Sequence, residues 1–171
     1  MGTTRRSWLA GLWGLPWALP SSLAVTAAPA AAAPPPLGST LALVDLPLIE
    51  GGTFPAAQAD GLVTVVYWWA SWCPFCAQMS PSVEKLWRTE RGRGLTVLGI
   101  AIDKTVEPAR DYRRRKGYTF PSAWYGADSG NVLPKASKVP MLWVRDRGGR
   151  VVMAETGQLF PEDVEQIARF L

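Results

Sequence analysis

The chain has 171 residues, of which 48% are hydrophobic and 19% charged, and its formal net charge is +4. Arg5 and Arg6 lie in an N-terminal segment without acidic residues, so the rest of the chain carries 16 Lys and Arg against 14 Asp and Glu. This near balance gives no basis for expecting a nucleic acid partner. The chain contains no His and only two Cys, which leaves few side chains suited to a metal site.

Residues 1–33 have the parts of an export signal. A short basic start is followed by an apolar stretch at 8–25, interrupted by Pro16 and Pro20, and then by small residues suited to cleavage. The segment Thr4-Arg5-Arg6-Ser7-Trp8-Leu9 resembles a twin-arginine signal, and ordinary secretion is the other route. We therefore predict a signal peptide and a periplasmic location. An uncleaved membrane anchor is the alternative, because about 18 apolar residues can just span a bilayer.

Three consecutive prolines mark residues 34–40 as a short tether. The residues after it suffice for one domain with a full core, so a single domain is predicted at 41–171. A first short strand is expected at 41–48, ahead of the turn signal Gly51-Gly52. The stretch 62–69 is β-branched or aromatic at nearly every position, which is typical of a central strand covered on both faces.

A helix is predicted at about 73–91, because apolar residues such as Met79, Val83 and Leu86 recur at helical spacing. Pro81 should bend it, since proline lacks the backbone N–H. The nearly all-apolar strand at 95–102 follows this helix and should therefore lie parallel to the preceding strand.

A second helix is predicted at 107–116 and a short extended segment at 120–124. The basic residues at 110 and 113–116 are interpreted as a solvated helix face. Strands at 141–144 and 150–154 read as an antiparallel hairpin, and a last helix begins at Pro161. One face of that helix is apolar: Val164, Ile167, Ala168 and Leu171. The predicted fold class is α/β, with a central mixed β-sheet flanked by helices.

The two cysteines form the motif Cys73-Pro74-Phe75-Cys76 at the start of the first predicted helix. Unpaired N–H groups and the helix dipole favour a thiolate at Cys73, and Cys76 is near enough to resolve a mixed disulfide formed there. A structural disulfide would close only a short loop and add little stability. A zinc site would have to recruit carboxylates, because no other Cys and no His is present. The motif therefore predicts a redox dithiol.

Further motifs agree with this interpretation. Trp72-Cys73-Pro74-Phe75-Cys76 after an apolar strand, Val139-Pro140 before another strand, and a final hairpin plus helix resemble the thioredoxin fold. Ala70-Ser71 before the dithiol, Pro81, Phe120-Pro121 and the sequence at 145–150 are similar to its exported TlpA-like branch. The resemblance covers residues 41–171. It implies a thiol:disulfide oxidoreductase, in which Pro140 is a cis-proline facing the dithiol and the backbone of Val139 pairs with an extended substrate.

Two positions depart from the family pattern. Thioredoxins carry a buried Asp six residues before the first Cys, where this chain has Tyr67. Many TlpA-like reductases carry a Glu three residues after the second Cys, where this chain has Met79. Both carboxylates that could take the proton of the resolving thiol are absent, so water, a backbone group or a substrate base would have to serve. No His lies between the cysteines, as it does in strongly oxidising DsbA-like proteins.

Aromatic residues near the dithiol fall into two groups. Trp72 and Phe75 flank the cysteines and, together with Pro74, are expected to form an apolar surface for client proteins. Trp68 and Trp69 lie within the predicted strand and are expected to be core residues.

The favoured function is an exported thiol:disulfide oxidoreductase. Cys73 attacks and Cys76 resolves, the partners are cysteine-containing exported proteins, and a membrane redox protein resets the dithiol. The direction of electron flow is open, with the reductase favoured. We expect a monomer that needs no cofactor and no metal. A thiol peroxidase and a redox-inactive binding or assembly module of an envelope complex are the alternatives.

Overall fold

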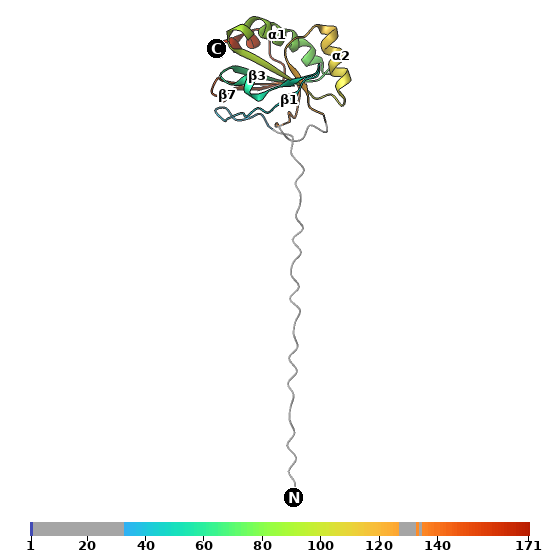
Figure 1. Cartoon of the computed structure of the whole chain (residues 1–171), viewed down its shortest axis with the longest axis vertical. Coiled ribbons are helices and arrows are strands. Elements are labelled where there is room, and N and C mark those ends of the chain that lie inside the picture. The colour runs from blue at the N-terminus through green and yellow to red at the C-terminus, as the bar shows by residue number, and fades with distance from the viewer. Residues whose placement is uncertain (2–32, 127–132, 134) are drawn as a thin grey trace.

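The computed structural model describes residues 1, 33–126, 133 and 135–171 (Figure 1). The predicted signal peptide lies almost wholly outside these residues. A five-stranded mixed sheet has the order β5-β4-β3-β6-β7. Its strands are β3 (Val63–Trp69), β4 (Leu95–Ala101), β5 (Ser122–Trp124), β6 (Met141–Arg145) and β7 (Val151–Thr156). β3, β4 and β5 are parallel, whereas β6 and β7 run antiparallel to their neighbours.

The helices are α1 (Pro74–Glu90), α2 (Val106–Lys116) and α3 (Pro161–Glu165). α1 connects β3 to β4 and α2 connects β4 to β5, so both serve as crossovers between parallel strands. Figure 1 shows α1 and α2 on one side of the sheet and the short strand β1 (Leu46–Pro47) on the other. Short 3₁₀ helices occupy Ala56–Ala59, Arg91–Arg93 and Gln166–Phe170.

The two faces of the sheet enter two separate cores. Along β3, Val65, Tyr67 and Trp69 pack with the helices, whereas Val66 and Trp68 face the opposite core. This alternation is the period of two that a strand imposes on its side chains. Residues from the segments before β3 and after β5 complete the second core: Leu41, Leu46, Phe54, Ala59, Leu133 and Ala136. The central strand is therefore buried on both faces, as its sequence predicts.

The expected first strand is the main error in the predicted order. Only β1 (Leu46–Pro47) is a strand there, and it pairs with β2 (Thr53–Phe54) outside the main sheet. The turn between them uses Gly51 and Gly52, both at positive φ. Upstream, Leu41 donates its N–H to Gly149, so backbone pairing with the hairpin turn replaces strand pairing at this point.

Contacts of the N-terminal segment with the domain begin before residue 41. The N–H of Gly38 lies 2.7 Å from the carbonyl oxygen of Val151, and Thr40 forms a bridge with Arg150. The last residues of the predicted tether are therefore held against the start of β7.

The last helix is shorter than predicted. α3 ends at Glu165 and continues as a 3₁₀ helix, which still buries Val164 and Ile167, while Ala168 and Leu171 are only half-buried. The interpretation of the basic run was wrong for Arg113, which is buried, pairs with Glu50 and lies over the ring of Phe120. In the described part of the chain, no helix is long and apolar enough to cross a membrane.

Candidate active site at the start of a helix

The dithiol lies where β3 passes into α1, at the carboxyl end of the parallel strands. Cys73 is the N-cap of α1 and Pro74 begins the helix, a position where the missing N–H of proline costs nothing. The backbone N–H of Cys76 donates to the sulfur of Cys73 at 3.3 Å. The first sulfur therefore receives one of the unpaired N–H groups of the helix start, as the sequence predicts.

The two cysteines are free thiols in different surroundings. Cys73 keeps 4% of its surface exposed, while Cys76 is fully buried. Burial, and next its hydrogen bond with Cys73, raises the pKa of the Cys76 thiol far above its usual range. Cys76 is therefore a shielded, protonated thiol, whereas Cys73 is the more accessible of the two.

Val139 and Pro140 lie against the first sulfur. The peptide bond between them is cis, as expected, and the thiol of Cys73 lies 3.5 Å from the carbonyl oxygen of Val139. The antiparallel pairing of β3 with β6 places Met141 opposite Trp68, which brings the residues before β6 to the end of β3. Residues far apart in the sequence thus form one site.

Three exposed side chains surround the dithiol. Trp72 keeps 64% and Phe75 55% of their surfaces exposed, and Pro74 is also exposed. Trp68 and Trp69 are fully buried, as predicted from their position in the strand. The apolar surface next to the cysteines is therefore formed by residues of the motif itself.

Asp103 is a residue of this site that the sequence reasoning missed. It follows β4 and accepts hydrogen bonds from the backbone N–H of Ser71, at 3.2 Å, and from its hydroxyl, at 2.5 Å. Trp124 donates its indole N–H to the carbonyl oxygen of Asp103 at 2.8 Å. A buried Asp directly after an apolar parallel strand was the available signal, because the carboxyl ends of such strands meet at one edge.

The two departures from the family pattern lie beneath the cysteines. Tyr67 and Met79 are both buried and pack in the same core as Cys73 and Cys76. The hydroxyl of Tyr67 lies 3.0 Å from the hydroxyl of Ser80 and donates to the carbonyl oxygen of Cys76 at 3.4 Å. The buried side of the site thus carries two hydroxyl groups, those of Tyr67 and Ser80.

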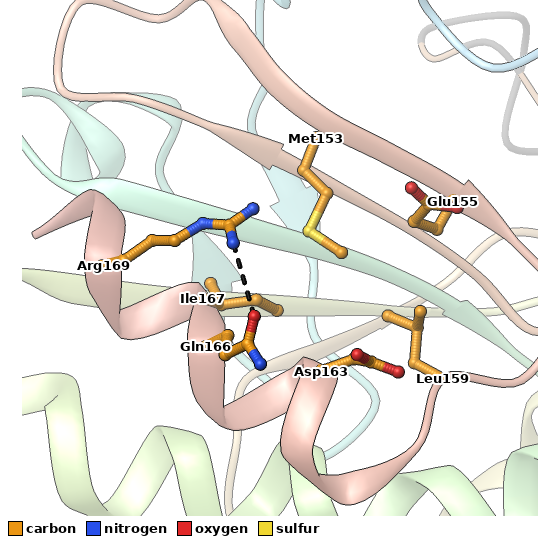
Figure 2. A pocket seen from close by; sticks show the side chains of 7 residues that line it. All are labelled: Met153, Glu155, Leu159, Asp163, Gln166, Ile167 and Arg169. Atoms are coloured by element: carbon orange, nitrogen blue, oxygen red, sulfur yellow. Dashed lines mark hydrogen bonds between the residues drawn. The ribbon is translucent and has the colours of Figure 1, made fainter.

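Among the described residues, no group of three or more His, Cys, Asp or Glu is arranged to hold a metal ion. A separate pocket lies between β7 and the C-terminal helical segment (Figure 2). Its lining includes Met153, Leu159 and Ile167, and Arg169 donates to Gln166 beside it. No residue of the dithiol site lines this pocket, so the two are distinct.

Residues 37–136 match the AhpC/TSA family. Thiol:disulfide interchange protein HelX of Rhodobacter capsulatus is 30% identical over 152 residues, which cover 87% of this chain and 76% of HelX. Thiol-disulfide oxidoreductase ResA of Geobacillus thermodenitrificans is 23% identical over 130 residues, covering 76% of this chain and 75% of ResA.

Solved structures show the same fold. A thiol:disulfide interchange protein of the thioredoxin family from Chlorobium tepidum superposes with a TM-score of 0.66, at 23% identity, covering 81% of this chain and 96% of that one. StoA from Bacillus subtilis superposes with a TM-score of 0.63, at 15% identity, covering 76% and 99%. Because the family match spans more than half of the residues and HelX aligns along most of the length, the chain belongs to the AhpC/TSA family and is a thioredoxin-like thiol:disulfide oxidoreductase.

Proposed function

We propose that this protein is exported to the periplasm and reduces disulfides of other exported proteins. The observation that carries the proposal is the position of the Cys73 sulfur, which lies between the N–H of Cys76 and the carbonyl oxygen of Val139 at the edge of an exposed apolar surface. A sulfur at this position is open to a client disulfide from outside and to Cys76 from within.

The reaction proceeds in two exchanges. The thiolate of Cys73 attacks a client disulfide, so that one client sulfur becomes bonded to Cys73 and the other leaves as a thiol after taking up a proton. Cys76 then attacks the sulfur of Cys73, which forms the Cys73–Cys76 disulfide and releases the second client sulfur as a thiol. The client gains two electrons and two protons, and the dithiol loses them.

The client is held by backbone and by apolar contacts. The chain at Val139 and Pro140 pairs with an extended client segment, since Val139 is half-buried and its carbonyl oxygen already contacts the reacting sulfur. Trp72, Pro74 and Phe75 provide a surface without charge, which suits clients of varied sequence.

The surroundings of Cys73 favour the reducing direction. A strong oxidant such as DsbA owes its high potential to a stabilised reduced form. The residues between these cysteines are Pro74 and Phe75, which carry no charge, and no charged side chain hydrogen-bonds to Cys73 Sγ within the described structure. The start of α1 is the main feature that stabilises the reduced dithiol, so the dithiol gives up electrons readily.

The protein acts as a monomer without cofactor, and a membrane redox protein returns two electrons to the Cys73–Cys76 disulfide after each cycle. The N-terminal sequence supports export, because its basic start, apolar stretch and small residues are those of a signal peptide. A peroxidase is less well supported, because a peroxidase would need Thr and Arg beside a single activated Cys, and in the described part neither residue type hydrogen-bonds to Cys73.

Trapping of mixed disulfides tests the proposed cycle. Cys76→Ser leaves the attacking thiol without its resolving partner, so it should accumulate mixed disulfides with exported proteins, while Cys73→Ser should accumulate none. Insulin reduction by the exported domain should disappear in Cys73→Ser. Undiminished biological function of Cys73→Ser would show a binding module in place of an enzyme.

The reduction potential tests the direction. Equilibration of the Cys73/Cys76 pair with glutathione buffers should give a value near that of thioredoxin, about −270 mV. A value near that of DsbA, about −120 mV, would reverse the assignment and make the protein an oxidant.

A further inference from the structure

A pair of buried hydroxyl groups lies directly beneath the resolving cysteine. Tyr67 of β3 and Ser80 of α1 are 0% and 1% exposed, and their hydroxyl oxygens are 3.0 Å apart. Ser80 is four residues after Cys76, so both lie on the same face of α1. The Tyr67 hydroxyl also reaches the carbonyl oxygen of Cys76 at 3.4 Å. Apolar side chains would fill this space at less cost, so the pair requires an explanation.

No buried carboxylate of the described structure is available to assist Cys76 in place of this hydroxyl pair. Its buried carboxylates are Glu84, Glu90 and Asp103. Glu84 accepts hydrogen bonds from Thr119, Phe120 and Arg88, Glu90 accepts one from Arg93, and Asp103 accepts those of Ser71. None of the three hydrogen-bonds to a cysteine, whereas the Tyr67 hydroxyl hydrogen-bonds to the carbonyl oxygen of Cys76.

Resolution of the mixed disulfide requires a thiolate at the buried Cys76. Cys76 must become a thiolate to attack the mixed disulfide, yet burial raises the pKa of its thiol far above the usual range. Hydrogen bonding by the backbone of Ala70, and next by the side chain of Tyr67, acts in the opposite direction and lowers that pKa. Burial, with the charge of Cys76 as the next cause, also raises the pKa of Tyr67 well above its usual value. Tyr67 therefore keeps its proton and acts as a donor, not as a base.

We propose that the Tyr67 hydroxyl, oriented by Ser80, donates a hydrogen bond to the sulfur of Cys76 as the thiolate forms and so makes Cys76 competent to resolve the mixed disulfide. In this arrangement Ser80 is the donor to the Tyr67 oxygen, so the single phenolic proton can turn from the carbonyl oxygen of Cys76 to its sulfur. In this step the S–S bond between Cys73 and Cys76 forms, the bond from Cys73 to the client sulfur breaks, and the proton of Cys76 passes through solvent to the client thiolate. The inference rests on the proposed function, because resolution by Cys76 is part of that cycle.

Stopped-flow reduction of a chromogenic aryl disulfide separates the two steps. The first release of coloured thiolate reports attack by Cys73, and the second reports resolution by Cys76. In Tyr67→Phe the first phase should be unchanged and the second about tenfold slower, because a hydrogen bond to a charged group is lost. In Ser80→Ala the second phase should slow by about threefold. Thr96→Val is the matched control, since it removes a buried hydroxyl at the far end of β4 and should leave both phases unchanged.

The pH profile of the second phase distinguishes this role from a structural one. Its midpoint reports the ionisation of Cys76, whose titratable neighbours are Cys73 on α1, Tyr67 on β3 and Tyr112 on α2. The midpoint should move to higher pH in Tyr67→Phe, because one hydrogen bond that favours the thiolate is lost. A folded Tyr67→Phe protein with an unchanged second phase overturns the inference. If Tyr67→Phe does not fold, an unchanged second phase in Ser80→Ala overturns it. Absence of the first phase in the native protein would instead contradict the proposed function.

Discussion

The carboxylate of Asp103 accepts both the backbone N–H and the hydroxyl proton of Ser71, at 3.2 and 2.5 Å. Asp103 follows β4 and Ser71 lies two residues before Cys73, so this pair fixes the loop that carries the Cys73 sulfur to the end of a neighbouring strand.

Asp103→Ala removes the acceptor for two Ser71 donors. We expect the free energy of unfolding to fall by about 2 kcal/mol and insulin reduction to slow, because the loop before Cys73 loses its anchor. Urea unfolding of the reduced protein measures the first effect. Asp146→Ala is the control, since Asp146 accepts the N–H of Arg150 in an exposed turn and its loss should cost less than about 1 kcal/mol. Equal losses of unfolding free energy in both variants would show that the hydrogen bonds of Asp103 stabilise the fold no more than those of an exposed turn.

Alkylation should distinguish the two thiols. Cys76 is fully buried and its pKa is raised, chiefly by burial, so at mildly acidic pH iodoacetamide should modify Cys73 first. Peptide mapping by mass spectrometry after short exposure of the reduced protein measures this order. Equal labelling of both cysteines would contradict the assigned roles.

The same burial predicts how the stability of the reduced protein depends on pH. The pKa of Cys76 is higher in the folded than in the unfolded chain, so above about pH 8.5 the unfolded state releases a proton that the folded state retains. Below that pH the ionisation of Cys76 should therefore not reduce the free energy of unfolding. It should then fall by up to about 1.4 kcal/mol per pH unit as the pH rises. Urea unfolding between pH 7 and pH 10 measures the slope, which Cys76→Ala should remove and Cys73→Ala should largely retain.

Glu84 should contribute stability with the opposite pH dependence. Burial raises its pKa, but hydrogen bonds from Thr119, Arg88 and Phe120 outweigh burial and leave the pKa lowered. Its contribution is therefore present above about pH 4.3, the unfolded value, and is lost as the pH falls through the lower folded value. At pH 7, Glu84→Gln should cost about 2 kcal/mol in chemical denaturation. Glu165→Gln breaks an exposed pair with Lys85 and should cost less than about 1 kcal/mol.

Restoring an acid beneath the dithiol tests whether proton transfer limits resolution. Met79 is 1% exposed and packs in the same core as both cysteines. A Glu at this position should have a raised pKa and could act as a base near neutral pH, so Met79→Glu should speed the release of the mixed disulfide while lowering stability. Met79→Gln has the same size without the acid and should not speed it. An unchanged or slower resolution step in a folded Met79→Glu protein would mean that the native protein already has an adequate proton route.

The sequence by itself predicted the fold class, the central strand and the cysteine pair with its helix. These features rest on local patterns: the apolar run at 62–69 is typical of a strand buried between two layers, and Cys73-Pro74-Phe75-Cys76 suits a helix start because proline is favoured at the first helical position. The placement of Pro140 before a strand also predicted its cis peptide bond. The strand expected at 41–48 failed because loose alternation does not say which backbone groups will pair with it.

Only the tertiary structure decided what surrounds the sulfurs. Tyr67 is one apolar-looking position in a run of eight, and nothing in the run shows that its hydroxyl meets Ser80 under Cys76. Asp103 and Arg113 look like ordinary charged residues, yet both are buried, one holding Ser71 and the other paired with Glu50. Such contacts join residues distant in the chain, and they depend on the register of β3 against β4 and β6, which turns Tyr67 towards α1. Local patterns fix which elements form, whereas the pairing of those elements fixes the chemistry at the site.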